Sequence, residues 1–158
     1  MSERTPMTRA GYAKLQEELK QLKSMDRPRI VREIEDARAH GDLSENAEYH
    51  ATKERQGHIE GRIRSVEDKL ARALVIDPSG QNGDSVRFGA TVVLEDAESG
   101  EQVTYTILGE EESDVARGRI SIQSPVARAL MGRTTGDSVT VRVPKGIREL
   151  EILEIRFD

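Results

Sequence analysis

The chain has 158 residues, enough for one ordinary domain or two small ones, and an aromatic content of 3% argues against one large globular core. Its net charge of -5 gives no global basic field for binding DNA, and the lack of cysteine excludes disulfides and thiolate metal sites. There is no apolar run of membrane-spanning length and no signal-peptide pattern at the N-terminus. We therefore expect a soluble, cytoplasmic protein.

Helical periodicity begins after Thr8, which can cap a helix. Apolar residues recur at Leu15, Leu19 and Leu22, spaced four and three apart as in a coiled coil. Pro28 interrupts this run, because proline lacks an N–H and crowds the preceding turn, so it either starts a new segment or kinks the old one. The same spacing resumes at Ile30, Ile34 and Ala37.

A second helical run begins near residues 43 to 46, after a reversal at Gly41. Gly57 and Gly61 lie four residues apart, where we expect two helices to approach closely, and each costs about 1 kcal/mol relative to Ala. Because the link is short, the two runs predict an antiparallel helix pair roughly 45 Å long. The expected seam of the second run is Ile59, Ile63, Val66, Leu70 and Leu74.

The second half of the chain changes to strand-like patterns after a stretch rich in Gly, Asn and Pro at residues 78–83, which we interpret as a linker. A hairpin signal at Glu98-Ser99-Gly100 separates the first two predicted strands. The predicted strands are residues 90–96, 102–108, 118–123, 138–143 and 148–157.

A short helix is predicted between the third and fourth of these strands, with Ser124 as its cap and Pro125 at its first position. Strands with one packed helix indicate an α+β fold. We therefore expect an antiparallel coiled-coil hairpin over residues 1–77 and a compact strand-and-helix domain over residues 84–158.

The hairpin tip, residues 41–48, carries two carboxylates three residues apart, Asp42 and Glu45. One explanation is local, because an Asp followed three residues later by Glu is close to a capping box, and Ser44 is an alternative cap. The other is functional: two carboxylates can share a Mg²⁺ ion, although they cannot supply its six oxygen ligands. A partner would then complete the site, as in two-metal phosphoryl chemistry.

Residues 37–50, Ala-Arg-Ala-His-Gly-Asp-Leu-Ser-Glu-Asn-Ala-Glu-Tyr-His, closely resemble the tip motif of the GreA/GreB transcript cleavage factors of bacterial RNA polymerase. The acidic balance and modest basicity of the tip place the chain nearer to GreA than to GreB. The resemblance covers essentially the whole chain and includes Arg27-Pro28-x-Ile30, Gln56-Gly57, Glu60 to Ile63, Val75 to Asp77, Ile120-Ser121, Ser124 to Gly132 and Gly136-Asp137.

This resemblance implies an N-terminal antiparallel coiled coil and a C-terminal domain of FKBP-like fold that docks at the rim of the polymerase secondary channel. The coiled coil would pass down the channel and stimulate the polymerase's own cleavage of backtracked RNA near its 3′ end, so that the factor is not itself an enzyme. The free factor is expected to be a monomer without a membrane partner.

The resemblance also implies roles for the tip residues. Asp42 and Glu45 match the acids that hold the second Mg²⁺, shared with the polymerase, and a hydrolytic water. Ser44 and Asn46 match neighbours that help to position substrate or water.

Basic residues near the tip have two interpretations. Arg38 and Lys53 match the family's RNA-facing positions, and contact with phosphates would give salt-dependent affinity. Arg55 has no such match and stays open between the two roles. The alternative for all three is an ion pair on the helix surface with Glu33, Glu35 or Glu54.

Other polar residues have structural explanations. Capping is a sufficient role for Ser124 and Pro125, although in the family the loop around them lies near the polymerase-docking surface. The three histidines, at positions 40, 50 and 58, show no metal-ligand spacing.

Two further functions remain open from the sequence. One is a channel-binding regulator that blocks the polymerase without promoting cleavage, although the Asp-Leu-Ser-Glu tip argues against it. The other is an FKBP-like prolyl isomerase or chaperone, which needs an aromatic-lined pocket. The second half offers only Phe88, Tyr105 and Phe157 for such a pocket.

Overall fold

The computed structural model describes residues 4–41, 46–77 and 84–157. The expected metal-binding acids Asp42 and Glu45, together with Ser44, lie outside these residues, as does the expected linker at 78–83. Within the described part of the chain, no helix is both long enough and apolar enough to cross a membrane.

The contacts divide the chain into two units. One contains Tyr12–Ala73, and the other joins Arg4–Gly11 to the chain from Leu74 onward. The expected domain bounds, 1–77 and 84–158, stay a prediction, and the contacts assign the N-terminal segment to the second unit instead of the helical one.

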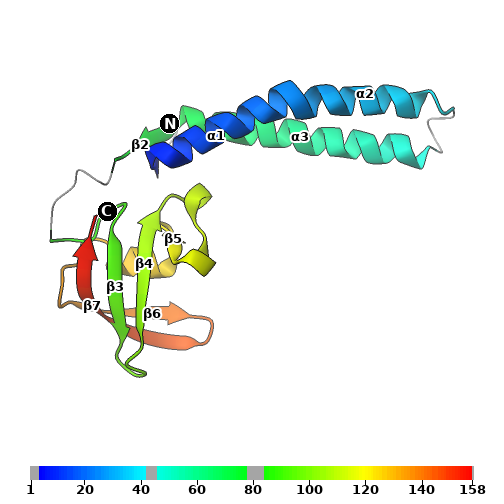
Figure 1. Ribbon diagram of the computed structural model, residues 1–158. Helices are drawn as coiled ribbons and strands as arrows, with labels where there is room; N and C mark the ends of the chain where they lie inside the picture. The colour runs from blue at the N-terminus through cyan, green and yellow to red at the C-terminus, as the bar shows by residue number, and fades with distance from the viewer. Residues whose placement is uncertain (1–3, 42–45, 78–83, 158) are drawn as a thin grey trace. The chain divides into compact units, whose positions relative to one another are not determined.

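The first unit is an antiparallel helical hairpin (Figure 1). Its first arm runs through α1 (Arg9–Gln21), a π-helical turn (Leu22–Asp26) and α2 (Arg27–Arg38), and its second arm is α3 (Ala47–Ala71). The seam is confirmed over these elements: its residues are buried at Leu15, Leu22, Ile30, Ile34, Ala37, Ile63 and Val66 and half-buried at Leu19, Ile59 and Leu70.

The π-helical turn accounts for the irregular step in the seam. Leu22 and Ile30 are eight residues apart, one more than a seven-residue repeat allows. In the turn, the N–H of Arg27 donates to the carbonyl of Leu22, five residues back, so one extra residue is absorbed. Pro28 follows at the start of α2, and the helical path continues through it.

Two expectations for the second arm are wrong. A Cβ added at Gly57 would meet no atom within 4 Å, and one at Gly61 would meet only the Arg64 guanidinium at 3.9 Å, so neither glycine marks a close helix approach. Leu74 does not extend the seam, because α3 ends at Ala71 and Leu74 is 44% exposed in a strand. Pairing with the N-terminal segment replaces the helical pattern there.

The second unit contains two sheets, and Figure 1 shows the larger one. The smaller pairs β1 (Thr5–Met7) with β2 (Ala73–Val75). The larger has the order β5-β4-β3-β7-β6, and all its neighbours are antiparallel except β4 and β5. Its strands are β3 (Thr91–Asp96), β4 (Gln102–Leu108), β5 (Arg119–Ser121), β6 (Ser138–Val143) and β7 (Gly146–Arg156).

These strands confirm the five predicted ones, with the third shorter and the fifth starting earlier than expected. The predicted helix is α4 (Pro125–Leu130), and Ser124 caps it as expected, since its Oγ accepts from the N–H of Ala127 at 3.3 Å. Two short 3₁₀ turns, η3 (Glu110–Glu112) and η4 (Val115–Arg117), precede β5. The α+β class is therefore confirmed.

The core of the second unit lies between the sheet and α4. Its buried side chains include residues of all five strands and of the helix, and in β3, β6 and β7 they lie two residues apart, as expected for one face of a strand. The largest fully buried ones are Val86, Val92, Leu94, Ile107, Leu130, Leu150 and Ile152.

A distant carboxylate secures the N-terminal segment within the second unit. Thr8 caps α1 as expected, because its Oγ1 accepts from the N–H of Gly11 at 3.0 Å. Glu112 accepts from the Thr8 backbone N–H at 2.8 Å and from the Thr8 hydroxyl. A Cβ at Gly11 would lie 2.5 Å from the Glu112 carboxyl carbon, so a side chain at this position would displace Glu112 from its bonds to Thr8.

Candidate functional site

The tip of the hairpin is organised by Asn46. Its Oδ1 accepts from the backbone N–H of Tyr49 at 3.0 Å, which makes Asn46 the N-cap of α3. Its Nδ2 donates to the carbonyl of Ala37, near the end of α2, at 2.7 Å. The cap is therefore Asn46 rather than Asp42 or Ser44, because α3 begins at Ala47.

Gly41 stands at the other side of the tip. Its φ of +116° lies in the region that favours glycine, and its N–H donates to the carbonyl of Arg38 at 3.5 Å. In the sequence, Asp42 and Glu45 therefore lie between a residue whose backbone conformation requires glycine and the cap of the next helix.

The first turn of α3 packs the tip. The rings of Tyr49 and His50 meet edge to face, with centroids 5.5 Å apart. Thr52 is buried, and its hydroxyl donates to the carbonyl of Glu48 at 2.6 Å. Tyr49 is half-buried, in agreement with a packing role.

Arg38 and Lys53 both extend into solvent close to the tip. Arg38 is exposed and forms no ion pair with another residue that the structure describes. Lys53 is exposed as well, and its Nζ donates to Gln56 Oε1 at 3.1 Å. Both ammonium and guanidinium groups are thus accessible to an anionic partner, and their contact with RNA stays a prediction.

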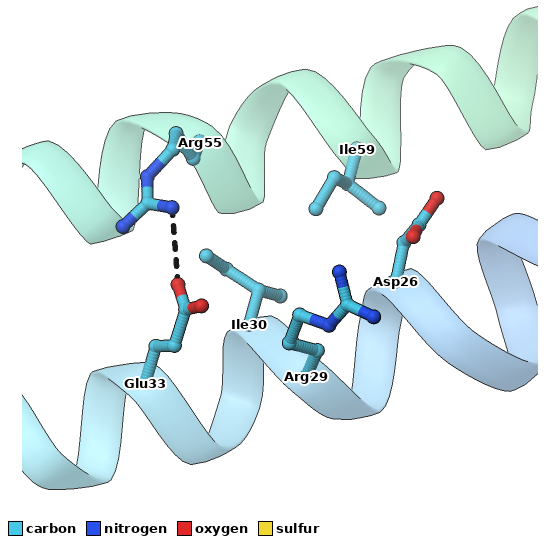
Figure 2. Close-up of a pocket in the computed structure, with 6 residues that line it drawn as sticks. All are labelled: Asp26, Arg29, Ile30, Glu33, Arg55 and Ile59. Atoms are coloured by element: carbon cyan, nitrogen blue, oxygen red, sulfur yellow. Dashed lines mark ion pairs between the residues drawn. The ribbon is translucent and has the colours of Figure 1, made fainter.

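Arg55 takes the structural role that the sequence left open. Its Nη1 lies 3.1 Å from Glu33 Oε2, across the hairpin (Figure 2). That carboxylate oxygen is buried without a hydrogen bond, so the nearby guanidinium compensates its charge. The RNA-facing role is therefore not needed to explain Arg55.

The Arg55–Glu33 pair borders a shallow groove between α2 and α3 (Figure 2). Its volume of about 190 Å³ is smaller than the few hundred Å³ typical of sites for organic ligands. The groove is lined by Asp26, Arg29, Ile30, Glu33, Arg55 and Ile59.

Further ion pairs cross the hairpin, and the sequence reading missed them. Arg27 donates twice to Glu60, at 2.9 and 2.8 Å, and these hydrogen bonds lower the pKa of Glu60. Lys23 pairs with Glu67 at 3.0 Å. The sequence does contain a signal for these pairs, namely the opposite charges that flank the apolar residues of the two helical runs. Such flanking positions face each other across a coiled coil.

The histidines form no metal centre with the residues that the structure describes. Between residues 4 and 157, leaving out 42–45 and 78–83, no group of three or more His, Asp or Glu side chains is placed to hold an ion. His58 lies 3.9 Å from Glu54 on the exposed surface of α3. A metal-binding role for the tip acids stays a prediction.

The expected docking residues Ser124 and Pro125 begin α4. Pro125 is exposed at the first helical position, and Ser124 is half-buried by its capping role. Their contact with a partner also stays a prediction.

Comparisons with known proteins cover nearly the whole chain. The family model described as "Transcription elongation factor, N-terminal" matches residues 5–75, and that described as "Transcription elongation factor, GreA/GreB, C-term" matches residues 81–157. Transcription elongation factor GreA of Anaeromyxobacter sp. (strain K) is 61% identical over 98% of this chain and 93% of its own length. GreA of Phenylobacterium zucineum is 54% identical, with 98% of this chain and 99% of the relative covered.

Among solved structures, GreA factor homolog 1 of Thermus thermophilus is 29% identical and covers 98% of this chain and 99% of that chain, with a TM-score of 0.45. The assignment rests on the sequence matches, which span both halves. The chain belongs to the GreA/GreB family of transcription elongation factors.

Proposed function

We propose that this protein is a cytoplasmic bacterial elongation factor that binds RNA polymerase and stimulates the polymerase's own cleavage of backtracked RNA. The family membership, combined with an Asp-Leu-Ser-Glu motif between the two arms of the hairpin, carries this proposal. The hairpin enters the secondary channel, while the C-terminal domain docks at its rim near Ser124 and Pro125. The free factor is a monomer.

Asp42 and Glu45 carry out the tip function in this proposal. Their carboxylates offer the hard oxygen ligands that Mg²⁺ prefers, and two of them fit half of a six-ligand site. The polymerase active site supplies the remainder. When bound, the ion would neutralise charge and activate a water for attack on the phosphodiester.

The other tip residues act on the RNA and on the geometry. Arg38 and Lys53 contact phosphates of the displaced RNA 3′ segment, and Ser44 helps to position substrate or water. The factor lends ligands to a catalytic centre in another protein and completes no reaction alone.

The central experiment measures RNA cleavage in a stalled, backtracked complex with wild-type factor, Asp42→Ala, Glu45→Ala and the double variant. Cleavage should fall to the level without factor, because each ligand lost leaves the shared site incomplete, while polymerase binding persists. Glu48→Ala, which removes an exposed carboxylate from the same tip, is the matched control and should cleave normally. Normal cleavage by the double variant would overturn the proposal.

Nucleotide addition is measured in the same reactions. A factor that inhibits addition at every concentration while giving no cleavage is a channel-blocking regulator instead. For the RNA contacts, Arg38→Ala and Lys53→Ala should reduce cross-linking to the RNA 3′ segment and make it less dependent on salt, because fewer phosphates are neutralised. Arg55→Ala is the control with the same charge change.

A further inference from the structure

Both polar atoms of the Asn46 side chain are used inside the hairpin. Oδ1 accepts from Tyr49 N–H at 3.0 Å, and Nδ2 donates to the Ala37 carbonyl at 2.7 Å. The two partners also fix the orientation of the carboxamide, because an N–H must meet the oxygen and a carbonyl must meet the NH₂. Asn46 thus links the end of α2 to the start of α3.

The hydrogen bond between Asn46 and Ala37 is partly shielded from water. Asn46 is half-buried, and Ala37 has no exposed surface. A hydrogen bond screened from water is stronger than one in solvent, and losing its donor leaves the carbonyl less well satisfied. The carbonyl of Ala37 also accepts from the N–H of His40, at a longer 3.2 Å.

We infer that Asn46 is a positioning residue, which sets the spacing between the two ends of the segment that carries Asp42 and Glu45. This inference rests on the proposed function. It differs from the role implied by the family resemblance, in which Asn46 positions substrate or water. The carboxamide acts through the chain: it holds the start of α3 against the end of α2, and Gly41 sets the direction of the chain on the other side.

The benefit is preorganisation. Two carboxylates that must meet an ion in another protein lose conformational freedom when they bind, and this loss is smaller when the residues that flank them are already held in place. Misplacement of a catalytic group by about 1 Å can cost roughly a hundred-fold in rate. The Asn46 link should therefore affect the rate of cleavage more than the affinity for polymerase.

Two substitutions separate the halves of the link. Asn46→Ser keeps an oxygen that caps α3 and removes the NH₂ that reaches Ala37, whereas Asn46→Ala removes both. Asn46→Ser should unfold close to the wild-type temperature, and Asn46→Ala at a lower one. Both should reduce the maximal cleavage rate at saturating factor roughly ten-fold or more. The factor concentration that gives half-maximal cleavage should stay unchanged.

Hydrogen exchange in the free protein distinguishes this role from direct contact with substrate. In Asn46→Ser, the amides of His40 and Gly41 should exchange faster, because the end of α2 has lost its tie, while the Tyr49 amide stays protected by the serine cap. In Asn46→Ala, the Tyr49 amide should exchange faster as well. Glu48→Ser is the matched control at an exposed neighbouring position and should leave all three amides unchanged.

The outcomes are separable. If wild-type factor fails to stimulate cleavage, the proposed function fails, and the exchange data still decide whether the link exists. If wild-type factor cleaves and Asn46→Ser retains its full maximal rate, the positioning role is wrong. A slower rate with unchanged exchange at His40 and Gly41 would also overturn it, since Asn46 would then act on the substrate directly.

Discussion

Arg62 donates two parallel hydrogen bonds to the Glu18 carboxylate across the hairpin, from Nε to Oε2 at 2.5 Å and from Nη2 to Oε1 at 2.7 Å. Each side chain retains 36% of its exposure, so water still screens the pair. The two-pronged geometry nevertheless fixes both side chains, and it ties α1 to the second half of α3.

The first prediction concerns the energy of this pair. In a double-mutant cycle with Glu18→Ala and Arg62→Ala, we expect a coupling of about 0.5–1 kcal/mol, the upper part of the range for exposed pairs. Urea unfolding of the four proteins at low salt measures it, and added salt should reduce it. A cycle that combines Glu17→Ala with Arg62→Ala is the control, and a coupling there equal to that of Glu18 would contradict the geometric explanation.

The second prediction concerns acid pH. Hydrogen bonds from Arg62 and Arg27 lower the pKa values of Glu18 and Glu60 from the ordinary 4.5. Backbone N–H groups of Ser99 and Glu98, with Arg148, lower that of Asp96 from 3.8. Because these pKa values are lower in the folded state, the carboxylates stabilise it above the unfolded-state values, and this stability is lost as the pH falls through the folded-state values.

The urea midpoint should therefore stay level from neutral pH down to about pH 5 and decline below about pH 4. Glu18→Gln removes one contributor, so its midpoint should be lower at neutral pH and converge on that of the wild type in acid. A constant difference between the two proteins at every pH would show that the ionised carboxylate is not the cause.

The third prediction compares two glycines, one in an ordinary helical conformation and one with a positive φ. Gly57 lies in the middle of α3 with open space around it, so Gly57→Ala should stabilise the protein by about 1 kcal/mol through helix propensity alone. Gly41→Ala should destabilise it by about 1–3 kcal/mol, because a φ of +116° strains a residue with a side chain. Thermal unfolding monitored by helical circular dichroism measures both, and equal effects would contradict the assignment.

The fourth prediction tests the cause of the π-helical turn. Deleting Met25, which is 48% exposed, reduces the step from Leu22 to Ile30 from eight residues to seven, so the seam should continue in an ordinary α-helix. The change in stability should be less than about 1 kcal/mol, the value for an ordinary point mutation.

Deleting Arg32 is the matched control for that experiment. Arg32 is also exposed, but it lies beyond the turn, so its loss would rotate Ile34 and Ala37 by about 100° away from the seam. We expect the loss of several kcal/mol typical of emptied core positions. Equal damage from both deletions would mean that the turn is required for another reason, such as the proline that follows it.

The apolar periodicity of the sequence predicted the helical seam and the five strands of the larger sheet, because these features depend on burial along one face of each element. Thr8 and Ser124 were also recognised as caps, since capping depends on neighbours within three residues. Local rules succeed where the partners of a residue are close in sequence.

The predictions that were wrong concern residues whose structure depends on parts of the chain that are far away in sequence. Leu74 matched the helical pattern, yet strand pairing with residues 5–7 determined its structure. The cap of α3 was placed too early, because Asn46 is selected by a second bond to Ala37, nine residues back. Gly57 and Gly61 suggested a close approach, which a one-dimensional spacing cannot verify.

The membership of residues 4–11 in the second unit has a consequence for how the chain folds. All residues of the helical hairpin exist once Ala73 has been synthesised, whereas the second unit needs both the beginning of the chain and Glu112, which is 104 residues from its partner Thr8. The N-terminal segment can therefore pair with β2 as soon as the hairpin is complete, whereas its bonds to Glu112 form only later. A proteolytic cut before Leu74 would leave the C-terminal fragment without strand β1, so such a fragment should recover its full stability only when a peptide covering residues 4–11 is added back.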